Sequence, residues 1–109
     1  MKIRFEKNTM RWRISQKELQ LLAQGQALVH ETVLPTMQLR FHVLVDGQSP
    51  PNGRFMNLEQ VVEGDWLDHV LLLSPQGLTD LQAEPLRALH EFVDGIDETE
   101  LMLEVDFKA

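Results

Sequence analysis

Apolar and charged residues alternate in two short runs near the start of the chain, 2–6 (KIRFE) and 10–14 (MRWRI). A period of two is that of a strand with one buried face. Between the runs lies 7–9, where Asn8 tolerates a left-handed backbone better than most residues, as a short hairpin loop requires. The pattern therefore predicts an antiparallel hairpin.

A helix-start signal follows this hairpin directly. Ser15 and Glu18 have the spacing of a capping box, in which each side chain accepts a hydrogen bond from the other residue's backbone N–H. Leu19 and Leu22 then share one helical face, and Gly25 suits a left-handed residue beyond the last turn. The sequence predicts a short helix between Ser15 and Gly25.

Four later stretches have strand-like patterns. They are 27–34 (ALVHETVL), 37–45 (MQLRFHVLV), 66–73 (WLDHVLLL) and 100–107 (ELMLEVDF). The first two, separated by Pro35-Thr36, predict a second hairpin. The third ends in four apolar residues and predicts a strand that is covered on both faces, and the fourth predicts the final strand.

The stretch 58–63 favours helix over strand. Asn57 and Gln60 have the spacing of an N-cap and its partner, and Gly64 can end one or two helical turns, although 55–57 could also extend as a strand. Before it, 46–54 (DGQSPPNGR) is rich in turn residues and predicts an irregular, mobile surface segment.

A second helix is predicted from Thr79 to Gly95. Thr79 and Gln82 form another capping-box pattern, and leucines recur after it at helical spacing. Pro85 removes one backbone donor, so the helix either bends there or begins near that residue.

These elements predict one α+β domain spanning residues 1–109. We expect a curled antiparallel sheet of five or six strands, for which a barrel-like form is one option, with one helix after the N-terminal hairpin and another before the last strand. No stretch of the sequence repeats another. The expected core residues are Ile3, Phe5, Trp12, Ile14, Leu19, Leu22, Leu39, Phe41, Val43, Leu71, Leu73, Leu86, Leu89, Leu101, Leu103 and Val105.

The overall composition narrows the partners and the location. The formal net charge is −7, which argues against nucleic acid as a partner because its phosphates would be repelled. The chain has no cysteine, which excludes disulfides and thiol chemistry and favours a reducing compartment. No run approaches the roughly 18–20 apolar residues of a membrane span, so we expect a cytoplasmic protein without membrane contact.

A basic set of residues lies on the polar faces of the predicted strands. The set consists of Lys2, Arg4, Arg11, Arg13, Arg40 and His42. The last predicted strand carries Glu104 and Asp106 on its own polar face. If that strand lies beside the N-terminal hairpin, the opposite charges pair across the sheet and contribute roughly 0.2–1 kcal/mol per pair.

A second interpretation is that the arginines converge on a ligand. The planar donor fork of arginine is suited to phosphate and carboxylate groups. The candidate anion-binding residues are Arg4, Arg11, Arg13 and Arg40. The pattern alone does not decide between ligand binding and charge pairing.

The sequence predicts no metal site, no cofactor and no catalytic residue. None of the histidines lies three to five residues from another, which is the spacing of common metal sites. They are His30, His42, His69 and His90. No nucleophile motif and no glycine-rich phosphate loop is present in the sequence.

Both ends of the chain carry a recognisable residue pattern. The N-terminal part combines Met1-Lys2-Ile3-Arg4 with Asn8, Arg11, Arg13, Ser15-Gln16 and Glu18, and the C-terminal part is 104–107 (EVDF). This pattern resembles that of a family of small bacterial proteins of unknown function, over about the first twenty and the last eight residues. The resemblance implies a hairpin, a helix start and a final strand at the two ends, and it implies no activity.

Two functional hypotheses follow. The first is a non-enzymatic interaction or regulatory module that presents a sheet face or an exposed edge to a protein partner. The second is a small anion-binding protein, or an enzyme that acts on a phosphorylated ligand through an arginine-rich sheet face. In either case we expect a monomer or a weak homodimer.

Overall fold

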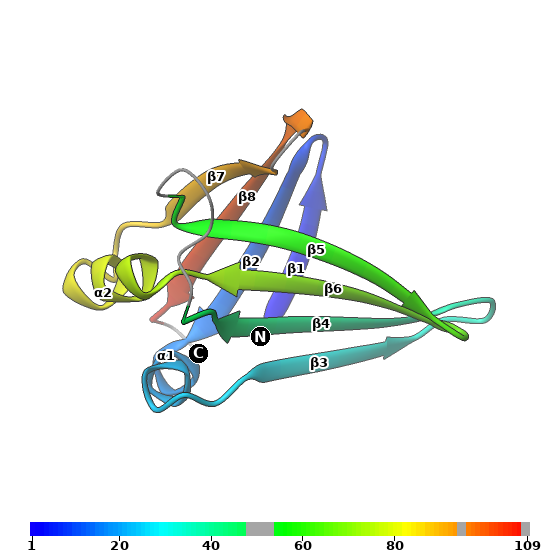
Figure 1. The fold of residues 1–109 in the computed structure, drawn as a ribbon, viewed down its shortest axis with the longest axis horizontal. Coiled ribbons are helices and arrows are strands. Elements are labelled where there is room, and N and C mark those ends of the chain that lie inside the picture. The colour runs from blue at the N-terminus through cyan, green and yellow to red at the C-terminus, as the bar shows by residue number, and fades with distance from the viewer. Residues whose placement is uncertain (48–53, 94–95, 108–109) are drawn as a thin grey trace.

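The structure, a computed structural model, describes residues 1–47, 54–93 and 96–107, which form two four-stranded sheets and two helices (Figure 1). Sheet A has the strand order β1–β2–β8–β7, and sheet B has the order β3–β4–β6–β5. The elements are β1 (Lys2–Glu6), β2 (Thr9–Ser15), α1 (Gln16–Ala23), β3 (Leu28–Val33), β4 (Gln38–Val45), β5 (Met56–Glu63), β6 (Trp66–Leu73), α2 (Pro75–Ala83), β7 (Leu89–Val93) and β8 (Ile96–Asp106).

The broad α+β class is confirmed, but the predicted single antiparallel sheet is wrong. Both sheets are mixed, because their two central strands, β2 with β8 and β4 with β6, run parallel. There are eight strands in the described residues instead of five or six, and neither sheet closes into a barrel. Most of the predicted irregular segment 46–54 lies outside the described residues, at 48–53. Among the described residues, no helix is both long and apolar enough to cross a membrane.

The N-terminal hairpin and its helix cap are confirmed. The register of β1 and β2 pairs Glu6 with Thr9, which leaves a two-residue turn, and Lys7 rather than Asn8 has the positive φ of 49°. The Ser15 hydroxyl accepts from the Glu18 backbone N–H at 3.1 Å, and the Glu18 carboxylate accepts from the Ser15 N–H at 2.9 Å. This capping box starts α1 where β2 ends.

The predicted helical turns at 58–63 are wrong, because this stretch belongs to strand β5. β5 pairs antiparallel with β6 along its whole length, with Glu63 opposite Trp66. Gly64 takes a positive φ of 60° in the turn between them, so it ends a strand and not a helix. Pairing with a neighbour outweighed a weak local cap signal.

The second helix is also displaced from its predicted position. α2 begins at Pro75 and ends at Ala83, and its N-cap is Ser74, whose hydroxyl accepts from the Gly77 N–H at 2.9 Å. The Thr79 hydroxyl instead donates back to the Pro75 carbonyl, within the helix. The chain turns at 84–88, and the rest of the predicted helix is strand β7, which pairs with β8. Proline at the first helical position explains why the Ser-Pro break after β6 also starts a helix.

Strand β6 is confirmed and lies inside sheet B, but only one of its faces is fully covered. Leu71 and Leu73 are buried in the core, whereas Val70 and Leu72 on the outer face stay partly exposed. The apolar run at 70–73 therefore reflects one buried face and one half-covered face, and not two buried faces.

The topology repeats although the sequence does not. The first half, β1–β2–α1–β3–β4, has the same element order as the second half, β5–β6–α2–β7–β8. Each half gives its first hairpin to one sheet and its second hairpin to the other, and the halves join through the two parallel pairs. Trp12 and Leu71 take equivalent central places in the two sheets, and neither is exposed. Neither sheet is complete within one half of the chain.

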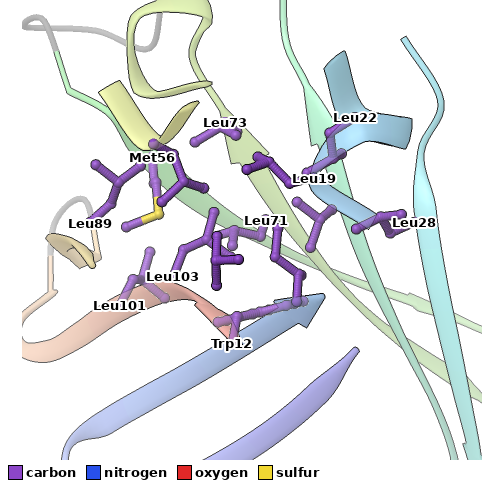
Figure 2. Close-up of a cluster of buried hydrophobic side chains, with 14 of the residues drawn as sticks. Trp12, Leu19, Leu22, Leu28, Met56, Leu71, Leu73, Leu89, Leu101 and Leu103 are labelled. Atoms are coloured by element: carbon purple, nitrogen blue, oxygen red, sulfur yellow. The ribbon is translucent and has the colours of Figure 1, made fainter. Parts of the chain in front are cut away.

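The core lies where the two sheets and α1 face each other (Figure 2). Most of the residues expected there are buried, but Phe5 is 60% exposed and Leu86 is 89% exposed, while Ile3 and Leu39 are only partly buried. Leu86 is outside the core because the helix that was expected to carry it ends before it. The core residues that the sequence analysis missed include Met10, Leu28, Met56, Leu81 and Val93.

Candidate functional site

Three of the four predicted anion-binding arginines lie together on the outer face of sheet A. In the β1–β2 register, Arg4 is opposite Arg11, and Lys2 is opposite Arg13. These side chains line a cleft of about 290 Å³. We call it the sheet A cleft, and its lining residues are Lys2, Ile3, Arg4, Arg11, Arg13 and Glu104.

Glu104 on β8 joins two of these arginines. Its Oε1 atom accepts from Arg11 Nη2 and from Arg13 Nε, each at 3.0 Å. This contact forms because β2 and β8 run parallel, with Arg13 directly opposite Glu104. The prediction that acids of the last strand lie beside the N-terminal arginines is therefore confirmed for Glu104. Asp106 is opposite Ser15 and does not line the cleft.

The positive charge in the sheet A cleft is only partly neutralised. Besides Glu104, the nearby Glu6 carboxylate lies 3.3 Å from Arg4 Nη1 and 3.5 Å from Arg11 Nη1. No ion pair to Lys2 is found among the described residues. The Nε atom of Arg11 is buried and has no hydrogen-bond partner. The cleft therefore keeps unused donors and an excess of cations.

The fourth predicted arginine, Arg40, belongs to a different network on the outer face of sheet B. Arg40 Nε and Nη2 donate to the two carboxylate oxygens of Asp68 at 2.7 and 3.0 Å, and His42 Nε2 lies 2.7 Å from the same Oδ1 atom. The Arg40 guanidinium also lies 4.4 Å from the ring centre of Trp66. The hydrogen bonds from Arg40 and His42 lower the pKa of Asp68, and the Asp68 hydrogen bond raises that of Arg40.

The pairing of His42 with Asp68 is also found in catalytic groups, where the histidine activates a nucleophile. The residues next to His42 across sheet B are Val29 on β3 and Val70 on β6. Neither valine supplies a hydroxyl group for the histidine to activate. Arg40 already donates hydrogen bonds to both carboxylate oxygens of Asp68. The chemistry of this network is that of a charged group holding two strands together.

An apolar surface lies at the far ends of the sheet B hairpins, which extend beyond sheet A (Figure 1). Leu34 and Met37, in the β3–β4 connection, and Val62 on β5 are 45%, 43% and 73% exposed, although the adjoining strands turn this face toward the core further along. Leu39 and Leu67 pair across the parallel strands between them and are partly exposed. We call Leu34, Met37, Leu39, Val62 and Leu67 the sheet B overhang.

Acidic residues lie at the same end of sheet B as the overhang, but because side chains alternate along a strand, Glu31, Glu59 and Glu63 are on the outer face with Arg40, opposite to the overhang. Glu31 is on edge strand β3, Glu59 and Glu63 are on edge strand β5, and Asp65 is in the β5–β6 turn, and all four side chains are exposed. Arg40 is the nearby cation, and Asp68 already pairs with it. This surface could not be predicted from the sequence, because its residues come from four separate segments, and one of them has a helix-like cap pattern.

A third site lies between the two sheets, next to the β1–β2 turn. It is a pocket of about 230 Å³ whose lining includes Phe5, Lys7, Gln60 and His69. The Gln60 side chain lies 3.1 Å from His69 Nδ1, and the imidazole stacks on Phe41 with ring centres 5.1 Å apart. Burial lowers the pKa of His69, although the nearby Asp68 charge acts in the opposite direction. A neutral imidazole can accept the amide hydrogen at Nδ1, which agrees with this direction.

A protein-family model matches residues 1–108 of the chain, and it is that of DUF7009, a family of unknown function. The match extends the resemblance seen at the two ends to nearly the whole chain. No curated protein and no solved structure matches it. Within the described residues, no group of three or more histidine, cysteine, aspartate or glutamate side chains is arranged to hold a metal ion.

Proposed function

The chain belongs to the DUF7009 family of unknown function, so its role has to be inferred from its own surfaces, and we propose that it is a non-enzymatic interaction module. In this proposal the sheet B overhang binds a protein partner. The observation that supports it is the group of exposed aliphatic side chains at the ends of two hairpins. Single exposed apolar residues are ordinary, but a contiguous group of them is typical of an interaction site.

The geometry of sheet B suits such contact. The overhang lies between the unpaired edges of β3 and β5, at hairpin ends that extend beyond sheet A (Figure 1). A partner could therefore cover the aliphatic side chains without rearrangement of the core. The aliphatic centre would supply most of the affinity, because apolar burial contributes about 25 cal/mol per Å² before the costs of association.

The acidic charge at this end of sheet B indicates the chemistry of the partner. Glu31 and Glu63 lie on the outer face behind the overhang and Asp65 lies in the β5–β6 turn, so a complementary partner is apolar where it contacts the overhang and carries positive charge around this contact. A second copy of this chain fits less well, because a two-fold interface through the overhang would bring the acidic ends of two copies close together. We therefore expect a different protein, and we expect its binding to weaken as salt concentration rises.

The proposal is tested by capture of partners on the immobilised protein, followed by affinity measurement with the purified candidate. Leu34→Asp combined with Val62→Asp places charges inside the overhang and should abolish binding. Leu86→Asp is the matched control, because Leu86 is exposed in the turn after α2 and lies outside the overhang. Circular dichroism should show that both variants keep the fold, since all three positions are exposed.

Two results would contradict the proposal. One is a partner that binds the overhang variant as tightly as it binds the unchanged protein. The other is self-association in analytical ultracentrifugation that disappears in the overhang variant, because a second copy would then occupy the surface. Loss of the partner with the overhang variant alone, together with weaker binding at high salt, would support it.

A further inference from the structure

We propose that the sheet A cleft binds a phosphate group, either free or carried by a small molecule. This site is separate from the sheet B overhang and does not depend on the function proposed for it. The inference starts from charge. Lys2, Arg4, Arg11 and Arg13 face two carboxylates, Glu104 and Glu6, which leaves two positive charges in excess on a chain of net charge −7.

The hydrogen bonds leave donors available for a ligand. Glu104 Oε1 fixes Arg11 and Arg13 with one contact to each, at Nη2 and Nε. An arginine has five N–H donors, and no hydrogen bond to the terminal nitrogens of Arg13 is found among the described residues. Glu104 therefore orients the two guanidinium groups without using their full donor capacity.

The size and the excess charge of the cleft indicate the class of ligand. A volume of about 290 Å³ is at the small end of ligand pockets, so the ligand is a small molecule and not a polymer segment. An excess of two positive charges matches a phosphate dianion better than a single carboxylate. The planar fork of arginine also forms paired hydrogen bonds with phosphate oxygens, whereas Lys2, opposite Arg13 in the β1–β2 register, supplies a point charge.

The test is a titration of the full chain with inorganic phosphate, phenyl phosphate and pyrophosphate at constant ionic strength set with sodium chloride. Calorimetry should show saturable binding, and the melting temperature should rise with ligand concentration because the ligand binds the native state. Tighter binding of phenyl phosphate than of inorganic phosphate would indicate an attached phosphate group, and the reverse would indicate the free ion. Succinate, a dicarboxylate, is the control for charge alone.

Variants locate the binding. Arg13→Gln should weaken phosphate binding about tenfold or more, because it removes charge-assisted hydrogen bonds and one positive charge from the cleft. Lys2→Gln should also weaken phosphate binding, and this variant should keep the fold because the Lys2 side chain is exposed. Arg87→Gln is the matched control, since Arg87 is an exposed arginine in the turn after α2 and should leave the affinity unchanged.

Three results would overturn the assignment. They are the absence of saturable binding to any of the three phosphate compounds, equal affinity in the Arg13→Gln and Lys2→Gln variants, and succinate binding as tight as phosphate binding. The sheet B overhang variant Leu34→Asp with Val62→Asp should retain phosphate binding. Phosphate binding and protein binding can therefore be lost separately, and each is tested by its own variant.

Discussion

Sheets A and B are built in the same way, but their far ends expose different chemistry. Each sheet combines one hairpin from each half of the chain around a parallel central pair. Where sheet B carries the aliphatic row Val62, Leu67 and Leu39, the equivalent row in sheet A is Lys7, Asn8 and Thr99. One scaffold thus leaves a polar end on one sheet and an apolar end on the other.

The outer faces differ in how their charges are used. On sheet B the Arg40 guanidinium is held by both oxygens of Asp68, and His42 completes the network. On sheet A the arginines share a single oxygen of Glu104 and line a cleft. Charges that are locked in a network hold strands together, whereas charges with spare donors are available to a ligand. This contrast separates a structural network from a candidate binding site.

The largest expected effect comes from the centres of the two sheets. Trp12→Ala and Leu71→Ala, at equivalent buried positions, should each lower the free energy of unfolding by about 3–4 kcal/mol, within the range for large-to-small core changes. Each half of the chain supplies one hairpin to each sheet. The loss of core packing in either sheet should therefore destabilise the whole molecule, which should unfold in one transition.

Tryptophan fluorescence can check this cooperativity. In a Trp66→Phe background, Trp12 reports on sheet A, while circular dichroism reports on both sheets. Urea unfolding of Leu71→Ala should give the same midpoint by both measurements, although Leu71 is in sheet B. Two separate transitions would show that the sheets unfold independently and would contradict the interlocked topology.

A smaller difference is expected between the two charge networks. Asp68→Asn should lower the melting temperature by several degrees, because the Asp68 side chain is 9% exposed and two basic groups bond to it. Glu104→Gln should cost less than about 1 kcal/mol, since the cleft is open to water and the arginines stay hydrated. An equal loss for the two variants would contradict the distinction drawn between them.

The pH dependence of the Asp68→Asn effect follows from the lowered pKa of Asp68. The folded state holds the charged carboxylate, so its contribution is complete above the ordinary pKa of 3.8 and is lost as the pH falls through the lower value in the folded protein. The difference in melting temperature between the unchanged protein and Asp68→Asn should therefore be constant above pH 5 and should shrink in stronger acid.

Local signals predicted the parts of this fold that depend on neighbouring residues. The Ser15–Glu18 capping box needs four consecutive residues, and the first hairpin needs alternation over a short stretch, and both are confirmed. Strands β5 and β7 could not be found in this way, because their conformation depends on pairing with β6 and β8. At 89–93, Leu89 and Val93 are four residues apart, a spacing that suits a helix as well as a strand.

The candidate sites also depend on which strands pair, and the sequence does not show this pairing. Arg4, Arg11 and Arg13 could be grouped from the sequence because they lie in one hairpin, and the structure brings them together. Arg40 was grouped with them on strand alternation alone, but its hairpin belongs to the other sheet. The sheet B overhang could not be assembled from sequence, because its members come from four segments whose order in the sheet differs from their order in the chain.

The smallest effect is expected from His69, which takes the place in sheet B that Met10 takes in sheet A. Burial lowers the pKa of His69 below its ordinary value of 6.5, so the unfolded chain takes up a proton first as the pH falls. The protein should therefore lose stability from pH 6.5 down to the lower pKa of the folded state. His69→Met, which copies sheet A, should remove this loss and cost about 1 kcal/mol at pH 7.5 through the lost Gln60 contact.

Urea midpoints at pH 7.5 and pH 5.5 measure this difference. The unchanged protein should unfold at a lower urea concentration at pH 5.5 than at pH 7.5, and the midpoint of His69→Met should change less between the two. His30→Gln is the matched control, because His30 is an exposed histidine on β3 and its replacement should preserve the fall. If the unchanged protein and His69→Met lose the same stability, the buried imidazole of sheet B is not the source of the acid sensitivity.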